Sequence, residues 1–147
     1  MASDRDRAIG ALIREWFPLP ETDLKTYSPL TLAFLGDGVF GLIVRSIVVG
    51  KGNSTARKLH KRTAELVNAR AQSVMMEGIE DSLSEEEKAV FLRGRNAHPA
   101  TMAKSASMRE YRRATGFEAL VGYLYLAGRE ERMMELIQMG MAYYERR

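Results

Sequence analysis

The chain has 147 residues, of which 46% are hydrophobic and 28% charged, which suits one globular domain. It contains no cysteine, and this excludes a disulfide framework and a zinc site built on thiolates. Residues 1–7 are charged and are not followed by an unbroken apolar run, so we expect no signal peptide, no membrane partner and a cytoplasmic location.

The first two helices are predicted from apolar spacing and from their end signals. One covers residues 8–16 and ends before Pro18. The next begins with Ser28 as N-cap, runs from residue 29 to about 48 and is ended by glycines. Its apolar residues lie on nearly every side, which places this helix at the centre of the fold.

The same helical spacing continues to the end of the chain, without strand alternation, repeats or low-complexity tracts. Ser54 or Thr55 can cap a basic helix, Asn68 marks a break, and Ser84 with Glu87 forms a capping box. We expect these helices over roughly 55–67, 69–76, 84–95 and 111–127 (ended by Gly128), a last helix from about residue 130, and a loop over about 98–108. The sequence predicts an all-α single domain.

Basic residues are concentrated in two segments. Residues 51–70 hold six Lys or Arg against Glu65 alone, and residues 93–113 hold six against Glu110 alone. Clustered cations favour a polyanionic partner, because they displace counterions from phosphates. The commoner meaning of a single charge run is a solvated helix face. Two such segments in one small chain favour nucleic acid without deciding it.

Two acidic residues interrupt the two most apolar predicted helices. Asp37 lies between Gly36 and Gly38, and Glu118 follows Gly116 by two positions. A buried carboxylate needs a cation, hydrogen-bond donors or a metal ion, and the ordinary explanation for one such acid is a salt bridge, here to Arg45, Arg112 or Arg113. Small residues clear space beside both acids, however, and this pattern indicates a hard-cation site between two packed helices.

Mg²⁺ prefers oxygen ligands and keeps several waters, so two carboxylates and a substrate phosphate suffice to hold it. A bound ion can polarise a phosphodiester and lower the pKa of an attacking water. The residues alone therefore predict metal-assisted phosphodiester chemistry beside basic helices that hold RNA. His60 and His98 are candidate general bases, but a metal-activated water needs neither, so duplex contact or capping is the expected role of each.

Two segments carry a resemblance to a known family. Residues 32–40, LAFLGDGVF, resemble the ribonuclease III signature L-E-F-L-G-D-[SA]-V-[LY]. Residues 115–126, TGFEALVGYLYL, resemble its second acidic motif, D-x-F-E-A-L-[IV]-G-A-[IL]-Y-L. The similarity is closest to the Mini-ribonuclease III branch, which lacks a separate double-stranded-RNA-binding domain. It implies one ribonuclease III endonuclease-domain-like helical bundle over residues 1–147, with an N-terminal helical extension at 1–26 and a core at about 27–147.

The resemblance also implies an activity: a Mg²⁺-dependent endoribonuclease, with Mn²⁺ as a substitute, that cuts double-stranded RNA as a homodimer. Mini-ribonucleases III act in bacteria on the ends of precursor 23S ribosomal RNA, so these ends are the expected substrate. The need for an accessory ribosomal protein is left open.

Site residues are carried over by position in the motifs. Asp37 matches the catalytic aspartate and Glu118 the metal-binding glutamate, whereas Ala33 and Thr115 stand where the family has two further carboxylates. We therefore expect weaker Mg²⁺ binding with more water ligands, and the number of ions stays open. The residues expected to contact RNA or brace the site are Arg57, Lys58, Lys61, Arg62, Arg93, Arg95, Asn96 and Lys104.

Two alternatives remain at this stage. A catalytically inactive RNA-binding or ribosome-associated scaffold is favoured by the missing acids at Ala33 and Thr115. The second alternative is a plain helical interaction protein, in which the two basic segments would be coincidental. Under this alternative we expect no salt-dependent affinity for RNA.

Overall fold

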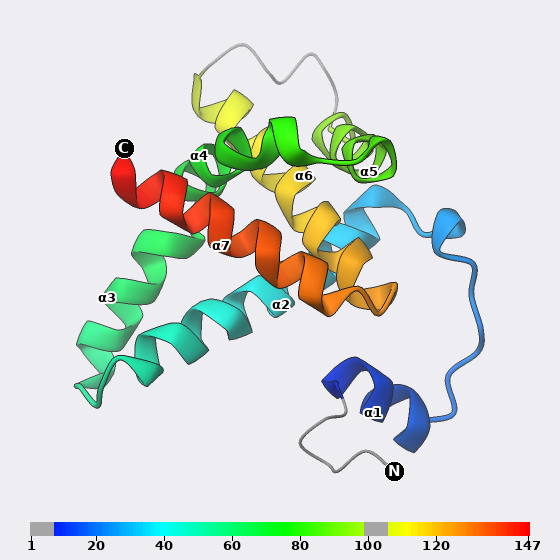
Figure 1. Cartoon of the computed structure of the whole chain (residues 1–147), viewed down its shortest axis with the longest axis horizontal. Coiled ribbons are helices and arrows are strands. Elements are labelled where there is room, and N and C mark those ends of the chain that lie inside the picture. Colours follow the sequence, from blue (N-terminus) through cyan, green and yellow to red (C-terminus); the bar gives the residue numbers. More distant parts are fainter. Residues whose placement is uncertain (1–7, 99–105) are drawn as a thin grey trace.

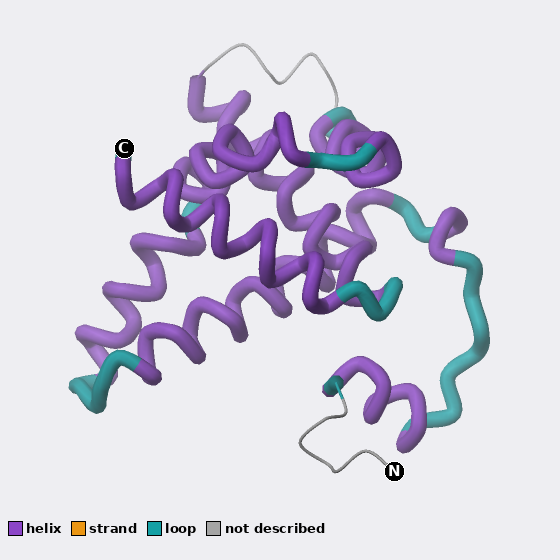
Figure 2. Tube along the Cα trace, in the orientation of Figure 1, coloured by secondary structure: helices purple, strands orange, loops and turns teal. Residues whose placement is uncertain are grey.

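The computed structural model describes residues 8–98 and 106–147, and no strand occurs among them (Figure 2). The helices in Figure 1 are α1 (Ile9–Trp16), α2 (Pro29–Gly50), α3 (Ala56–Val67), α4 (Ala69–Ile79), α5 (Glu85–Arg95), α6 (Ala106–Leu126) and α7 (Glu130–Arg146). Two 3₁₀ turns that the sequence did not predict cover Leu24–Thr26 and Glu80–Ser82. The all-α prediction is confirmed.

α2 and α6 cross with their backbones in contact. A Cβ atom on Gly36 would lie 1.7 Å from the carbonyl oxygen of Glu118, and one on Gly122 would lie 2.1 Å from the carbonyl oxygen of Leu32. Any side chain at either position would force the helices apart, so glycine is required for this approach. The crossing places the residue after Gly36, which is Asp37, beside Glu118.

The hydrophobic core forms around α6, which packs against α2, α4, α5 and α7. Phe40 and Phe117 meet edge to face with ring centroids 5.2 Å apart, in an arrangement that aromatic pairs prefer. Met75 and Met76 are fully buried and fill the space between α4 and its neighbours, as flexible thioether side chains commonly do. α6 is thus held on several sides, which fixes the site residues that it carries.

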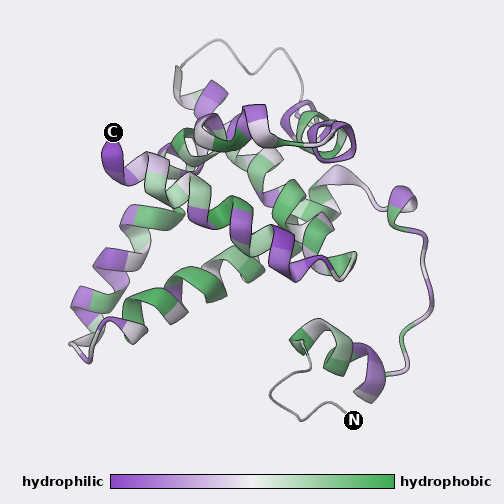
Figure 3. Cartoon of the chain, viewed as in Figure 1, coloured by the Kyte–Doolittle hydropathy of each residue, from purple (hydrophilic) through white to green (hydrophobic). Residues whose placement is uncertain are grey.

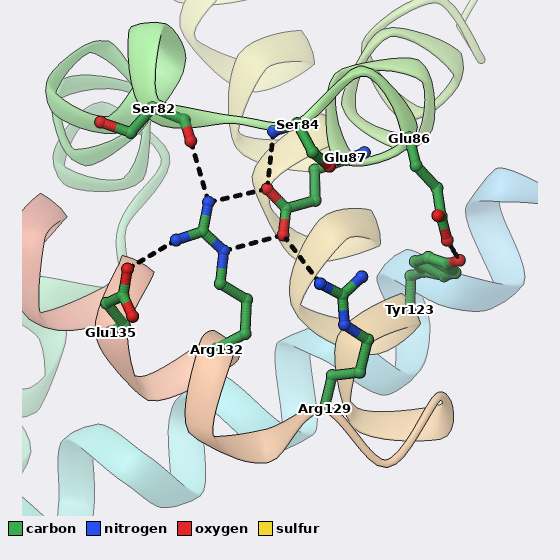
Figure 4. A network of polar contacts seen from close by, with 8 residues as sticks. All are labelled: Ser82, Ser84, Glu86, Glu87, Tyr123, Arg129, Arg132 and Glu135. Carbon is green, nitrogen blue, oxygen red and sulfur yellow. Dashed lines mark hydrogen bonds and ion pairs between the residues drawn. The ribbon is translucent and has the colours of Figure 1, made fainter.

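A polar network joins α5 to α7 (Figure 4). The side chain of Glu87 is fully buried and accepts two hydrogen bonds of 2.9 Å from the Arg132 guanidinium. It also accepts the backbone N–H of Ser84, which completes the predicted capping box, and lies 3.8 Å from Arg129. Chiefly through the hydrogen bonds from Arg132, these contacts lower the pKa of Glu87 to about 2, despite its burial.

α2 is less enclosed than its sequence predicted. By length and composition alone the helix could cross a membrane, and Figure 3 shows it hydrophobic along most of its length. One side packs on α6 and α3, which identifies it as a core helix. Four large apolar side chains on α2 are nevertheless exposed, because no described element covers them: Leu30, Phe34, Leu42 and Val49.

Most predicted helix ends are confirmed. Asn68 ends α3 and caps α4, and Gly128 ends α6 with a φ of 73°. Gly50 is still helical, and Gly52, with a φ of 140°, makes the following turn. α6 begins at Ala106, earlier than predicted. α1 precedes the core on an extended connection (Figure 1), and the boundary expected near residue 27 stays a prediction.

Candidate active site

The two predicted acids meet in a pocket between α2 and α6. The side chains of Asp37 and Glu118 are hydrogen-bonded to each other. The pocket has a volume of about 330 Å³ and is lined by Leu30, Ala33, Phe34, Asp37, His98, Tyr111, Thr115 and Glu118. The structure therefore brings together the pair that the two motifs predicted.

The surroundings of the two carboxylates differ. Glu118 is half-buried, and burial together with the neighbouring Asp37 carboxylate raises its pKa to about 8. At neutral pH Glu118 thus keeps a proton, which it can donate to Asp37. Asp37 itself is exposed, so the expectation that both acids are buried was wrong for this residue. It lies on the uncovered side of α2, where solvent reaches its carboxylate.

The arginines that could have neutralised these acids bind elsewhere. Arg45 donates to the carbonyl of Gly41 at 3.1 Å, and Arg112 donates to the carbonyl of His98 at 2.9 Å. Arg113 lies 3.0 Å from the carboxylate of Glu80. Within residues 8–98 and 106–147, no cation forms an ion pair with Asp37 or Glu118. Among the described residues, the simple salt-bridge explanation therefore fails for both acids.

The donor set fits a weakly held hard cation. The described residues contain no cluster of three or more His, Cys, Asp or Glu able to hold a metal ion. Two oxygen ligands from Asp37 and Glu118 suit Mg²⁺, which keeps several waters and shares the rest of its shell with substrate phosphate. Ala33, where the family has a carboxylate, lines the pocket and leaves room for solvent.

Thr115 stands at the other position where the family has a carboxylate, and it faces the same pocket. Its hydroxyl donates to the carbonyl of Tyr111 at 3.0 Å, and its oxygen lies 3.4 Å from Nε2 of His98. Because the single hydroxyl proton goes to Tyr111, the contact with His98 requires an N–H on the ring, and the Thr115 oxygen stays an acceptor. The His98 ring also packs on Tyr111 at a centroid distance of 5.0 Å.

Gln72 is a site residue that the sequence reasoning missed. It is buried, its amide nitrogen donates to the carbonyl of Val67 at 3.2 Å, and its amide opposes the rise in the pKa of Glu118. A polar residue among the apolar positions of α4 was the available signal.

The predicted RNA-binding residues do not line the pocket. All four on α3 are exposed: Arg57, Lys58, Lys61 and Arg62. At the end of α5, Arg93 donates to the carbonyl of Tyr27 at 3.4 Å, and Arg95 donates to Asn96 at 3.2 Å. α3 and α5 lie on opposite sides of the helical core (Figure 1). Lys104 lies outside the described residues.

Comparisons with known proteins identify the family of this chain. Residues 30–129 match the ribonuclease III domain family. Mini-ribonuclease 3 of Clostridium tetani is 45% identical over 124 residues, which cover 84% of this chain and 82% of that protein. Mini-ribonuclease 3 of a Thermoanaerobacter species is 43% identical over 127 residues, covering 86% and 89%. A crystal structure of a Fusobacterium nucleatum protein superposes with a TM-score of 0.72 at 32% identity, covering 83% of this chain and 98% of that one.

The helical fold of the described residues and the family match thus define a class, the ribonuclease III type of nuclease, whose members generally depend on a divalent metal, act on double-stranded RNA and typically dimerise. Within that class, the chain belongs to the ribonuclease III family as one of the Mini-ribonucleases III. The prediction of an endoribonuclease is confirmed, and the inactive-scaffold alternative loses its support.

Proposed function

We propose that this endoribonuclease cuts double-stranded RNA with Mg²⁺ held between Asp37 and Glu118, and that Mn²⁺ can replace it. The observation that supports the proposal most directly is the meeting of these two carboxylates, while the nearby arginines bind other groups. Like charges placed together without a cation are unfavourable, so the arrangement gains stability when a divalent ion joins it.

The chain's own residues have distinct roles in this proposal. When bound, the ion supplies a Lewis acid that polarises the phosphodiester and lowers the pKa of an attacking water. Glu118 would release its proton, and Asp37 and Glu118 together would hold the ion. The Thr115 oxygen, whose proton is committed to Tyr111, accepts a hydrogen bond from solvent in the pocket. Ala33 leaves space for that solvent.

Exposed cations on both sides of the pocket hold the duplex. A-form RNA offers phosphates and 2′-hydroxyls rather than accessible base faces, so lysine and arginine side chains suit it. The α3 residues and the end of α5 would contact separate parts of one duplex: Arg57, Lys58, Lys61, Arg62, Arg93, Arg95 and Asn96. Lys104, which follows α5, belongs to the same proposal.

We also propose a homodimer formed through the exposed apolar side of α2. Leu30, Phe34, Leu42 and Val49 are between 46% and 83% exposed, with Phe34 the most exposed. A two-fold dimer pairs one surface with itself, and a long apolar helix face suits such pairing. A Cβ atom on Gly38 would meet nothing within 4 Å, so the centre of this face is open to close approach.

The proposed substrate is the duplex formed by the ends of precursor 23S ribosomal RNA, in the bacterial cytoplasm, with an accessory ribosomal protein as a presenting factor. Similarity to Mini-ribonucleases III over most of the chain supports this assignment. Wild-type protein incubated with a precursor duplex should release the mature ends, and an unpaired RNA of the same composition should stay intact.

The decisive experiment compares wild type with Asp37→Asn on long double-stranded RNA, with Mg²⁺, Mn²⁺ or a chelator. Wild type should cleave only when a metal is present, whereas the variant should bind RNA but not cut it. Cleavage by Asp37→Asn at the wild-type rate would remove the metal assignment.

A matched variant tests the RNA surface separately. Lys58→Glu with Arg62→Glu should weaken duplex binding and reduce the salt dependence of affinity by about one counterion per lost phosphate contact. Metal affinity should not change, because neither residue lines the pocket.

A further inference from the structure

The helix α1 carries an apolar face that its own subunit leaves uncovered. Ile9, Ile13 and Trp16 recur at helical spacing along one side of the helix and are 53%, 37% and 75% exposed. Phe17 and Leu19, in the extended connection that follows, are 59% and 58% exposed. We call these five residues the α1 apolar face. Single exposed apolar residues are ordinary, whereas five so close together mark an interaction surface.

The contact between α1 and its own subunit uses a different side of the helix. Gly10 is buried, and a Cβ atom on it would lie 3.2 Å from Oε1 of Glu130 and 3.5 Å from the ring of Tyr125. With 3.6 residues per turn, Gly10 lies about a quarter of a turn away from the stripe of apolar side chains. The helix therefore rests on its subunit through its smallest residue, and this contact leaves the α1 apolar face free.

The exposed side of α2 is too small to hold two subunits together permanently by itself. Its four exposed side chains, Leu30, Phe34, Leu42 and Val49, leave roughly 400 Å² of apolar surface open. Permanent homodimers bury at least about 1,000 Å² on each partner, of which about two thirds is apolar. The α1 apolar face exposes roughly 500 Å² more. The two faces together therefore supply the area that the α2 side lacks.

The connection between the two faces allows them to act together. Only residues 17–28 separate α1 from α2, and apart from the 3₁₀ turn at Leu24–Thr26 they form an extended segment (Figure 1). The helix also lies outside residues 30–129, the part of the chain that matches the ribonuclease III domain family. α1 can therefore lie against another subunit without any change in the family's helical core.

Charge favours a protein surface as the partner of this face. Within residues 8–20, Arg14 and Glu15 are the only charged residues, and their charges cancel. Nucleic acid and anionic lipid surfaces instead attract segments with an excess of lysine and arginine. A neutral, apolar segment gains most by burial against another apolar surface.

We propose that α1 is an arm that packs its apolar face on a second copy of this chain, next to the exposed side of α2, and so completes the dimer. Proteins of the ribonuclease III type typically dimerise, so a second copy is the available partner. In a two-fold dimer each arm covers the same place on the other subunit, and the added area counts twice. The inference rests on the proposed dimer and assigns a role to a helix outside the family domain.

Trp16 provides the test, because it is the only tryptophan in the chain and its fluorescence reports on this face alone. Wild-type protein is diluted through the dimer–monomer transition, which analytical ultracentrifugation locates. In the dimer, Trp16 should emit at shorter wavelength than in the monomer, and acrylamide should quench it several-fold less, because burial excludes both water and quencher. This measurement needs no variant that could fail to fold.

Trp16→Ser measures how much the arm contributes. Truncating a central aromatic side chain of an interface commonly weakens binding at least roughly 30-fold, and the variant should dimerise at least that much more weakly. Ala11→Ser is the matched control, because Ala11 is exposed on the opposite side of α1 and should leave dimerisation unchanged. Neither residue lines the acid pocket, so cleavage per dimer should match wild type once both variants are concentrated enough to dimerise.

A dimer in which Trp16 stays as exposed as in the monomer, or wild-type dimer affinity in Trp16→Ser, would overturn the inference and leave a dimer through α2 intact. Shielding of Trp16 at every protein concentration would show that α1 packs on its own subunit. Shielding only after addition of duplex RNA or anionic vesicles would assign the face to that partner, and either result would overturn the inference. A wild-type protein that stays monomeric would instead overturn the proposed dimer itself.

Discussion

Glu87 on α5 and Glu118 on α6 are carboxylates on neighbouring helices with opposite surroundings. Glu87 is fully buried, receives two hydrogen bonds from Arg132 and lies close to Arg129, and its pKa falls to about 2. Glu118 is half-buried and faces another carboxylate, Asp37, so its pKa rises to about 8. The same functional group is stabilised as an anion at one site and disfavoured as an anion at the other.

The difference separates an acid that holds the fold together from one that is available for chemistry. The arginines around Glu87 satisfy its charge within the protein, and nothing further is needed there. The acid pair at Glu118 lacks that compensation among the described residues, and an external cation can supply it. Four predictions would break or sharpen this comparison.

The largest expected effect is on stability, at the Glu87 network. Arg132→Met leaves a buried carboxylate without its main partner and should lower the free energy of unfolding by about 3–5 kcal/mol, measured in urea at pH 7. The matched control is Arg129→Met, whose pair at 3.8 Å is partly exposed and should cost no more than about 1 kcal/mol.

The pH dependence of that effect follows from the lowered pKa of Glu87. A carboxylate with a folded-state pKa of about 2, below its ordinary 4.5, contributes stability above pH 4.5 and loses it as the pH falls towards 2. The difference between wild type and Arg132→Met should therefore shrink in acid. Equal stability of the two proteins at pH 7 would contradict the structural role.

The second effect is on catalysis, at the acid pair. Glu118→Gln removes a proposed metal ligand, so cleavage of double-stranded RNA should fall more than about 100-fold, beyond the usual loss from an outer-shell partner. Thermal stability should change little, in contrast to Arg132→Met. A gel assay for cleavage and a filter assay for RNA binding separate the two properties. A variant that cuts normally would show that Glu118 is only structural.

The third effect is on metal affinity. Because the pKa of Glu118 is about 8 without metal, binding an ion must displace a proton at lower pH. Mg²⁺ affinity should therefore weaken by up to about tenfold per pH unit below pH 8 and level off above it. Calorimetric titration at pH 6.5, 7.5 and 8.5 measures this slope. A flat profile would mean that Glu118 is already ionised.

The smallest effect concerns stability without metal. In Asp37→Asn, the repulsion that opposes ionisation of Glu118 disappears, so at pH 9 the metal-free variant should be more stable than wild type. The gain should not exceed about 1 kcal/mol, because solvent screens the exposed Asp37. At pH 6, where Glu118 keeps its proton, the two proteins should unfold alike. Destabilisation at pH 9 would mean that Asp37 has a stabilising partner.

Much of the fold followed from local signals in the sequence. The capping box at Ser84 and Glu87, the break at Asn68 and the cap at Gly128 were predictable, because each depends on chemistry within a few residues. The early start of α6 and the two 3₁₀ turns were missed, because a single turn of helix is too short to show an apolar period. The exposure of Asp37 was also missed, because apolar spacing cannot tell which side of α2 remains uncovered.

The sequence by itself determined that Asp37 and Glu118 are acids flanked by small residues within apolar helices. Its two motifs predicted that they form one site. The tertiary structure decided that Gly36 and Gly122 let α2 and α6 touch, and that the nearby arginines turn to other acceptors. The physical reason is range: helix caps and periodicity act over a few residues, whereas the electrostatic state of a carboxylate depends on groups that only folding brings near.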